Sequence, residues 1–496
     1  MHAACAFRTF LAVAAFATAL AVPVRAAAPD DDPRRVFADP PREYHTLPFW
    51  VWNDDLTDEQ VRFWMQDFAD HNIRSVIVHP RPGLMTPYLS DRWFALWKLA
   101  LAEAERLDMD VWIYDENSYP SGFAGGFVPE AMPDAKAVNL VAKESKAPPA
   151  MTEDIEAVFR IEGDVAEDIT AKLKAGGATG AGRYLAVSRK PDGRAAEWYG
   201  GWWYVDLLRP GVTEKFLDLT LEPYRARLGD QFGRRIPGSF TDEPHLSGAG
   251  GLPWTGDFAA RFEQRWGYAL RPQLASLFQP AGDWRRVRHD YYKLAHELFV
   301  ERWAKPYFEY CAKNRLEFTG HYWEHSWPQC RQVPDNMAMY AWHQRPAIDI
   351  LFNQYAEGTH AQFGNVRSLR ELASAAAQRG FLRTLCEGYG GAGWDARFED
   401  LKRIGDWLLV LGVNTLNQHL SHTTVRGARK RDYPVSFSYH APWWNAYGEQ
   451  ARYFARLQAA LAQGGPAPAA ALVIEPTTTA WLHQEGQRVG DRKSVV

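Results

Sequence analysis

Residues 75–114 read SVIVHPRPGLMTPYLSDRWFALWKLALAEAERLDMDVWIY, and this stretch decides the expected fold. Its first residues, Ser75 to Val78, are a short apolar run typical of a buried strand, and Asp110 to Tyr114 form a second such run. Between the two runs, bulky apolar residues recur at helical spacing from Trp93 to Leu101. A strand, a helix and another strand in succession predict neighbouring strands of a parallel sheet.

The same alternation continues on both sides of this stretch. Leu47 to Trp52 is an earlier strand, and the helix after it begins at Thr57 with Gln60 completing a capping box. Further strands are expected at residues 236–240, 316–319, 348–352, 383–386 and 413–417. Further helices are expected at residues 212–228, 257–266, 287–312, 369–379, 398–411 and 443–462. Eight strands with intervening helices predict an α/β fold, a (β/α)8 barrel of the TIM type.

The alternation is interrupted between residues 132 and 208. Three strand-like runs follow one another there without helices, at residues 159–161, 183–187 and 202–207. We therefore expect a small β-rich lobe, residues 132–208, inserted within a catalytic barrel that spans residues 29–464. Residues 465–496 are expected to be a linker and the incomplete start of a truncated C-terminal domain, with a strand at residues 471–474.

The first 28 residues have the pattern of a signal peptide. Arg8 precedes an apolar run at residues 10–22, and small residues at 26–28 offer a cleavage site. The apolar run is too short to span a bilayer as a helix. The sequence thus predicts export to the periplasm or the medium, and no membrane association after the signal is removed.

Composition limits the class of partner and the redox chemistry. A formal net charge of −4 without long runs of one sign argues against a nucleic-acid partner. Beyond the signal, the cysteines are Cys311, Cys330 and Cys386, an odd number that excludes a full disulfide framework. We expect buried thiols, with a Cys311–Cys330 bridge as the alternative.

Polar side chains follow nearly every expected strand. They are Asn53, His79, Arg81, Asp115, Glu116, Asn117, Asp242, Glu243, His321, Glu324, Asn353, Gln354, Glu387, Asn417, Gln418 and His419. Active sites of (β/α)8 barrels are built at the carboxyl ends of the strands. Each residue alone could cap a helix or bond a loop, but their recurrence around the barrel predicts a site.

Two of these residues can divide the work of glycosidic cleavage, which needs a carboxyl group on each side of the scissile bond. Glu243 follows the fourth strand and Glu387 the seventh, so they are expected on different sides of the barrel mouth. The alternative for Glu243 is an ion pair with an arginine, and for Glu387 a cap of the glycine-rich loop at residues 388–393. Asp242, Asp115, Glu116 and Glu324 are the reserve carboxylates.

The chain is rich in tryptophan, with 21 residues, and tryptophan rings pack cores and also stack on sugar rings. Those near strand ends are the better candidates for a cleft: Trp52, Trp254, Trp323 and Trp394. The predicted substrate contacts are Trp52, His79, Arg81, Asp115, Glu116, Asp242, His321, Glu324, Trp394, Asn417 and His419.

Residues 321–325 match H-x-x-E-H, a zinc-peptidase pattern that places its ligands on one face of a helix. Here the motif follows a strand, where four residues of extended chain span about 13 Å, too far for one metal ion. We therefore expect no zinc, although His321 and Glu324 are still expected to face the substrate.

Residues 426–432 contain four cations, Arg426, Arg429, Lys430 and Arg431. They could steady an acidic substrate, or they could form a solvated loop that pairs with nearby acids. The second interpretation is favoured, because such runs are more often solvated.

Several segments, in order, resemble glycoside hydrolase family 106, the bacterial α-L-rhamnosidases. They are PFWVWN at residues 48–53, HPRPGLMTPYLS at 79–90, YDENSYPSG at 114–122, FTDEP at 240–244, TGHY at 319–322, CEGYGGAGW at 386–394 and GVNTLNQHL at 412–420. The resemblance covers residues 48–461.

The resemblance implies a catalytic barrel that removes terminal α-L-rhamnosyl residues from oligo- or polysaccharides by inversion. By motif match, Glu243 would be the general acid and Glu387 the general base. Inversion predicts carboxyl groups ~6.5–9.5 Å apart. The resemblance also implies calcium near the sugar, without assigning its ligands. The alternatives are a barrel glycosidase for another sugar, such as a galactoside, and a truncated carbohydrate-binding protein without turnover.

Overall fold

The computed structural model describes residues 32–177, 180–193, 200–324, 329–351, 360–463 and 471–483. Several predictions lie outside these residues: the signal peptide, His325 of the zinc-like motif, the strand-end residues Asn353 and Gln354, and the residues of the linker before 471.

The core of the molecule is a sheet of nine parallel strands in the order β13-β12-β11-β10-β8-β3-β2-β1-β14. The strands are β1 (Phe49–Trp52), β2 (Ser75–Pro80), β3 (Asp110–Tyr114), β8 (Gly238–Asp242), β10 (Glu317–His321), β11 (Arg345–Ile350), β12 (Leu385–Gly388), β13 (Leu416–Gln418) and β14 (Ser421–His422). The edge strands β13 and β14 are consecutive pieces of one segment, and β14 pairs with β1. The Leu47 N–H also donates to the Leu416 carbonyl at 2.9 Å. The sheet is therefore nearly closed, which confirms the predicted barrel.

Alternation along the strands divides the barrel into an inside and an outside. Phe49 and Val51 of β1 belong to an interior cluster that is separate from the main core. Trp50 and Trp52 belong to the main core instead. Because side chains alternate along a strand, β1 directs its two tryptophans outward toward the helix layer.

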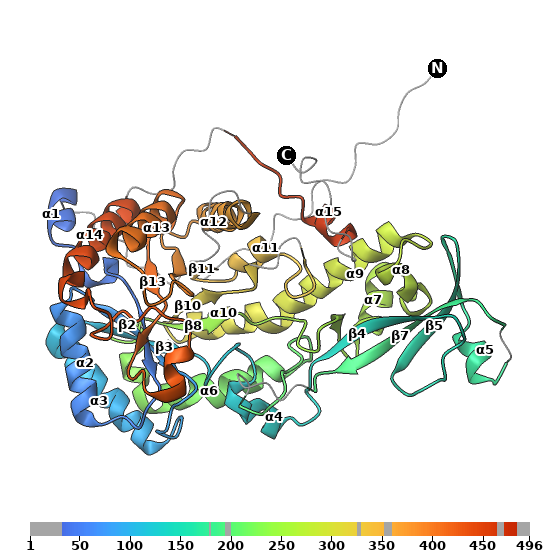
Figure 1. Ribbon diagram of the computed structural model, residues 1–496, viewed down its shortest axis with the longest axis horizontal. Helices are drawn as coiled ribbons and strands as arrows, with labels where there is room; N and C mark the ends of the chain where they lie inside the picture. Colours follow the sequence, from blue (N-terminus) through green and yellow to red (C-terminus); the bar gives the residue numbers. More distant parts are fainter. Residues whose placement is uncertain are drawn as a thin grey trace.

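Helices flank the barrel (Figure 1), and each buries apolar residues along one side. They include α2 (Asp58–Asp70), α3 (Asp91–Leu107), α6 (Val212–Leu228), α9 (Trp284–Phe299), α10 (Lys305–Lys313), α12 (His360–Arg379), α13 (Phe398–Val410) and α14 (Trp444–Gln463). The predicted capping box is present, because the Thr57 hydroxyl accepts from the Gln60 N–H at 3.2 Å and the Gln60 side chain accepts from the Thr57 N–H at 2.9 Å. The expected helix at residues 287–312 is split into α9 and α10 by a π-helical turn at Val300–Ala304.

A five-stranded antiparallel sheet projects from the barrel, on the right in Figure 1, in the order β6-β5-β7-β4-β9. Its strands are β4 (Val138–Ser145), β5 (Ile155–Glu162), β6 (Val165–Asp168), β7 (Arg183–Pro191) and β9 (Leu252–Trp254). The expected strand at residues 202–207 is wrong, because this segment makes only an isolated bridge between Val205 and Lys136. One edge strand of this sheet is β9, which follows β8 in the chain.

The expected strand at residues 471–474 is also wrong. Residues 471–476 form no regular element, and Leu472 is 90% exposed. The short helix α15 (Thr477–Leu482) follows and packs on α9 through Trp481, whose indole N–H donates to the Pro334 carbonyl at 2.6 Å. An apolar run alone therefore did not distinguish a strand from an exposed coil.

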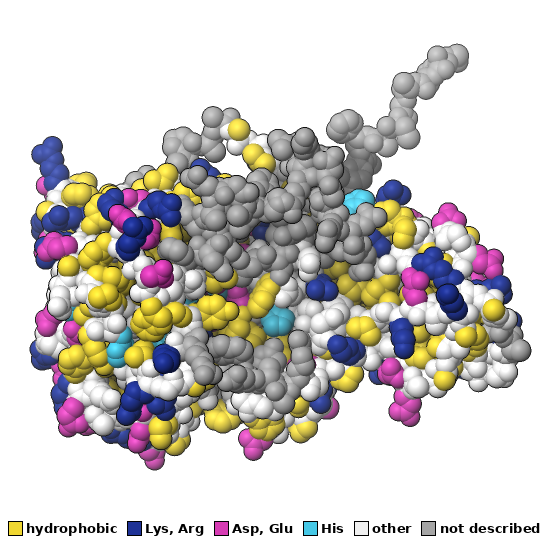
Figure 2. All heavy atoms as spheres, in the orientation of Figure 1, with side chains coloured by type: hydrophobic (Ala, Val, Ile, Leu, Met, Phe, Trp, Pro, Cys, Tyr) yellow, Lys and Arg dark blue, Asp and Glu magenta, His cyan; other side chains and the backbone are white. Residues whose placement is uncertain are grey.

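The three cysteines are buried free thiols, as expected, and the alternative Cys311–Cys330 bridge is not formed. Among the described residues, no helix combines the length and apolar character needed to cross a membrane. On the face drawn in Figure 2, the described acidic and basic side chains are interspersed.

Candidate active site

Strand register brings the predicted carboxylates to one end of the barrel. His321 of β10 lies opposite Asp242 of β8, and Glu387 of β12 lies between Asp349 of β11 and Asn417 of β13. All five residues are buried. Because the strands are parallel, these side chains are grouped at the carboxyl ends, where barrels place their active sites.

The imidazole of His321 is the centre of this group. Its Nε2 lies 2.7 Å from Glu387 Oε2 and 3.7 Å from Asp242 Oδ1, and its Nδ1 lies 3.9 Å from Glu324 Oε2. Burial by itself would lower the pKa of His321, but the hydrogen bond to Glu387 and the surrounding carboxylates raise it well above its usual value.

Glu387 is embedded in the same network. Burial and the charges of Asp349 and Asp242 act to raise the pKa of Glu387, and the hydrogen bond and charge of His321 act against them to lower it. The second carboxylate oxygen of Glu387, Oε1, lies 3.6 Å from His419 Nε2. Burial lowers the pKa of His419 to about 3, so this second histidine is neutral.

Glu243 comes directly after β8 and has its own partners. Its φ is +48°, a left-handed conformation that is uncommon for a residue with a side chain. The Glu243 N–H donates to the His321 carbonyl at 3.1 Å, and the Tyr119 hydroxyl donates to the Glu243 carboxylate. Glu243 and Glu387 therefore have different immediate neighbours, an environment that can separate their acid–base behaviour.

Asp115 and Glu116 hold the loop that follows β3. The carboxylate of Asp115 accepts from Ser121 Oγ at 2.6 Å and from Tyr307 Oη at 3.0 Å. The carboxylate of Glu116 accepts from backbone N–H groups of the loop, those of Asn117, Gly122, Ala124 and Gly125. Both residues are 0% exposed, so the structure places these predicted substrate contacts in support of the loop.

Arg81 and His79 form a second supporting network. Arg81 binds both carboxylate oxygens of Asp432, at 2.7 and 3.0 Å, and its third nitrogen lies 3.0 Å from His79 Nε2. The ring of His79 stacks on Tyr114 at a centroid distance of 3.6 Å, and the Tyr114 hydroxyl donates to Asp242 at 2.6 Å. These residues connect the loop around Asp432 to the carboxylate group.

Two further predicted contacts have structural partners. Asn417 donates to the Leu47 carbonyl at 2.6 Å, which is where the barrel closes. Glu324 accepts from the Tyr340 hydroxyl at 2.8 Å and from the Tyr322 N–H at 3.1 Å.

The tryptophans predicted to line a cleft differ in their exposure in the structure. Trp52 is fully buried and packs edge-on against Trp93 of α3 at 4.8 Å, so the prediction that it contacts substrate is not supported by its position. Trp254 is buried beside Phe258. Trp394, in contrast, is 40% exposed and lies 6.4 Å from the His422 ring.

The cationic segment at residues 426–432 pairs with acids, as favoured. Arg426 binds Asp54 at 2.7 Å, Arg429 lies 3.7 Å from the same carboxylate, and Asp432 binds Arg81. These arginines therefore anchor the segment to the barrel.

Comparison with known proteins shows the family to which this chain belongs. Residues 191–482, more than half of the chain, match glycoside hydrolase family 106, which is described as alpha-L-rhamnosidase. The chain belongs to this family. The matched region contains Glu243, His321 and Glu387, whereas β1, β2 and β3 precede it.

Two known proteins are similar to this family 106 chain, one in structure and one in sequence. A rhamnosidase structure from Novosphingobium sp. PP1Y superposes with a TM-score of 0.63 at 15% identity, covering 87% of this chain and 61% of that protein, which shows a shared fold. A Formosa agariphila protein named "Putative beta-glucuronidase" is 26% identical over 273 residues, 52% of this chain and 22% of that protein. The chain thus spans less than two thirds of either relative.

The calcium that the family resemblance implies would need a set of oxygen donors. Asp242, His321 and Glu387 each offer one atom within 4.8 Å of the others. Calcium prefers six to eight oxygen ligands, and one of these three donors is a ring nitrogen already bonded to Glu387. This described trio therefore does not fit calcium, and it is better described as a hydrogen-bonded group.

Three residues that act on the group of carboxylates were missed in the sequence: Tyr114, Tyr119 and Asp349. A signal was available for Asp349, because a carboxylate within the apolar run IDI of β11 is unusual in a buried strand. Tyr119 has no comparable signal, since its contact with Glu243 depends on how the loop after β3 folds.

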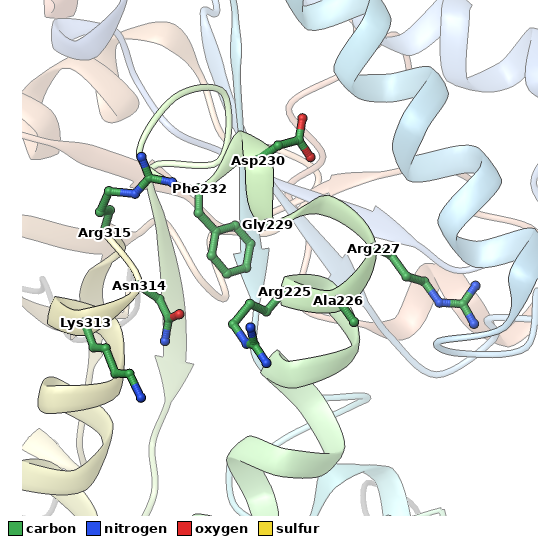
Figure 3. Close-up of a pocket in the computed structure, with 9 residues that line it drawn as sticks. All are labelled: Arg225, Ala226, Arg227, Gly229, Asp230, Phe232, Lys313, Asn314 and Arg315. Carbon is green, nitrogen blue, oxygen red and sulfur yellow. The ribbon is translucent and has the colours of Figure 1, made fainter.

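A surface hollow lies at the opposite end of the barrel (Figure 3). It is lined by the end of α6 and the end of α10, including Arg225, Phe232, Lys313 and Arg315. These segments precede β8 and β10, so the hollow is at the amino-terminal end of the barrel, where residues generally serve stability. It is therefore not a candidate for the active site.

Proposed function

We propose that this chain is the barrel of a glycoside hydrolase that removes terminal α-L-rhamnosyl residues by inversion. Glu243 would be the general acid and Glu387 the general base. The observation that carries this proposal is the pair of buried carboxylates after β8 and in β12, each with its own partners. Inverting hydrolysis needs two carboxyl groups in different protonation states.

In the proposed reaction, Glu387 removes a proton from water as the oxygen attacks the anomeric carbon. The glycosidic C–O bond breaks, and Glu243 gives its proton to the leaving oxygen. His321 supports the base, because its Nε2 lies 2.7 Å from Glu387 Oε2. Burial and the neighbouring Glu243 raise the pKa of Tyr119, so its hydroxyl stays neutral beside the acid.

The proposed substrate contacts are now fewer than the sequence predicted. Asp242, His419 and Trp394 stay as candidates, and the half-exposed Trp394 could stack on a sugar or aryl ring. His79, Arg81, Asp115, Glu116 and Asn417 are proposed to position the site, because each has a protein partner there.

Rhamnose is proposed as the sugar because the family is described by that activity. A β-glucuronide is the second candidate substrate, because the Formosa agariphila relative carries that name. The non-enzymatic alternative is a protein that binds sugars at the same site without turnover.

The test is hydrolysis of aryl α-L-rhamnosides by the wild type, Glu243→Gln and Glu387→Gln, with Glu449→Gln on the exposed surface of α14 as the matched control. We expect both site variants to lose about 10²–10⁴-fold in kcat/KM. Glu243→Gln should lose less with a good leaving group, which needs little protonation, whereas Glu387→Gln should lose equally with good and poor leaving groups.

The outcomes separate the candidates. Inversion requires that the first sugar product seen by NMR has the opposite anomeric configuration, and a retained configuration would exclude it. Turnover of aryl β-glucuronides alone would favour the second substrate. Binding of rhamnose to a folded wild type without any product would favour the binding protein.

Calcium and export stay predictions. We propose to compare the same assay with added calcium and with a chelator, since a calcium-dependent enzyme would lose activity in the chelator. Export predicts that the protein recovered outside the cytoplasm begins near residue 29, which N-terminal sequencing would test.

A further inference from the structure

One histidine is surrounded by acids in the interior of this barrel. The side chain of His321 is 1% exposed, and three carboxylates face its ring nitrogens: Glu387 at 2.7 Å, Asp242 at 3.7 Å and Glu324 at 3.9 Å. They come from β12, from β8 and from the segment after β10. An uncompensated group of buried carboxylates is costly, and one cation among them relieves that cost.

The carboxylates are held as acceptors by hydroxyl groups. Tyr114 donates to Asp242 at 2.6 Å, and Tyr340 donates to Glu324 at 2.8 Å. Burial, together with the acid beside each ring, raises the pKa of both phenols, so they remain donors. Donation from these hydroxyls favours the ionised carboxylates, and the ionised carboxylates in turn favour a charged His321.

The other titratable groups around the cluster do not supply this cation. His343 and His419 are buried, and burial lowers the pKa of each to about 3. Asp349 adds a further carboxylate beside Glu387. Arg81 is charged, but it binds both oxygens of Asp432.

We propose that His321 is the positioning residue of the base: as an imidazolium it donates from Nε2 to Glu387 Oε2 and keeps Glu387 ionised, so that Oε1 accepts the proton of the attacking water. This assignment rests on the proposed function only for the role of Glu387. In the reaction, Glu387 gains one proton from water while His321 keeps both of its own. The ring is buried and acts on the substrate only through Glu387.

The kinetic test uses His321→Gln, whose amide can still donate near the Nε2 position but carries no charge. We expect kcat to fall about tenfold to a hundredfold with KM little changed. The acid limb of the pH–kcat/KM profile should move up by about one pH unit, because Glu387 loses its cation and its pKa rises.

The matched control is His343→Gln, a buried histidine near the same ring that is already neutral. It should leave the acid limb in place. A role that is only structural would lower the melting temperature of His321→Gln without moving the limb, and that result would overturn the proposal.

A second measurement does not depend on turnover. In protein labelled with 15N-histidine, the His321 signals, identified by their loss in His321→Gln, should report a doubly protonated ring at about pH 7. In Glu387→Gln the ring should lose its proton at a lower pH than in the wild type. A neutral ring in the wild type would overturn the proposal. If the His321 ring is charged but the protein hydrolyses no glycoside, the assigned charge of His321 is supported and the proposed function is rejected.

Discussion

At the scale of single residues, buried carboxylates in this barrel have different uses. Glu387 and Glu243 are the proposed base and acid. Glu116 instead accepts hydrogen bonds from backbone N–H groups of one loop, and Asp115 accepts hydrogen bonds from the hydroxyls of Ser121 and Tyr307. Burial raises the pKa of Asp115 to about 7, against the effect of its hydroxyl donors. A supporting carboxylate can thus have a perturbed pKa, and perturbation alone does not identify the acid and the base.

The raised pKa of Asp115 predicts that the free energy of unfolding depends on pH. Because the folded-state pKa of Asp115 lies above its unfolded value, only the folded protein holds the proton between about pH 4 and pH 7, so stability from this group is lost as pH rises through that window. The Asp115→Asn variant has no carboxyl group at this position, so its stability does not fall with pH for this reason. The stability of the variant relative to wild type should rise by about 1–3 kcal/mol between pH 5 and pH 7, measured by urea unfolding. Asp230→Asn, at an exposed site, is the control, and a difference that is constant with pH would contradict this assignment.

The sequence predicted which residues lie near the site better than what each residue does. Several polar residues expected after strands, Asp242, His321 and Glu387 among them, are grouped at the carboxyl end of the barrel. The role of Glu116 could not be predicted, because its partners are backbone groups of a loop whose path the sequence pattern does not define. Trp52 was misplaced because both faces of a barrel strand are apolar, so alternation does not tell which face is inside.

At the scale of elements, β10 approaches β8 unusually closely at one glycine. Gly320 has φ +119°, and a Cβ there would lie 1.9 Å from the Thr241 carbonyl oxygen. The next pair in the register is His321 and Asp242. The absence of a side chain at residue 320 thus brings the histidine to its carboxylate.

We expect Gly320→Ala to destabilise the protein by about 2–6 kcal/mol, because the backbone is strained and the new methyl group meets backbone atoms. Where the variant folds, kcat/KM should fall with it, since β10 must move away from β8. Chemical unfolding and the rhamnoside assay measure the two effects. Gly256→Ala has open space around its Cβ and should change little, and an equal effect of both substitutions would argue against this close approach.

Helices were predicted more reliably than short strands. The helix at residues 212–228 has the expected bounds, because its apolar periodicity extends over several turns. The three-residue strand β9 has no pattern of its own and exists only through pairing with β4. Its pairing is a tertiary contact, which local sequence does not encode.

At the scale of the whole molecule, the projecting sheet is joined to the segment that carries Glu243. That segment leaves β8, passes Glu243 and returns to the sheet as β9. Asn139 of β4 is fully buried and donates to the Leu246 and Leu252 carbonyls at 2.8 and 3.1 Å, and it accepts from the Ala249 N–H at 2.8 Å. The Asn139 side chain thus helps to hold the path between the proposed acid and the sheet.

Asn139→Ala should therefore affect both stability and the acid, although its side chain bonds the segment beyond Glu243 and not Glu243 itself. It leaves three backbone groups without their partner, at a cost of about 2–5 kcal/mol in urea unfolding. If the segment then shifts Glu243, the loss of kcat/KM should be greater for rhamnosides with poor leaving groups, which depend on protonation. Lys143→Ala, at an exposed position of the same strand, should change neither quantity. Lower stability with an unchanged dependence on the leaving group would mean that the sheet supports the barrel without setting the position of its acid.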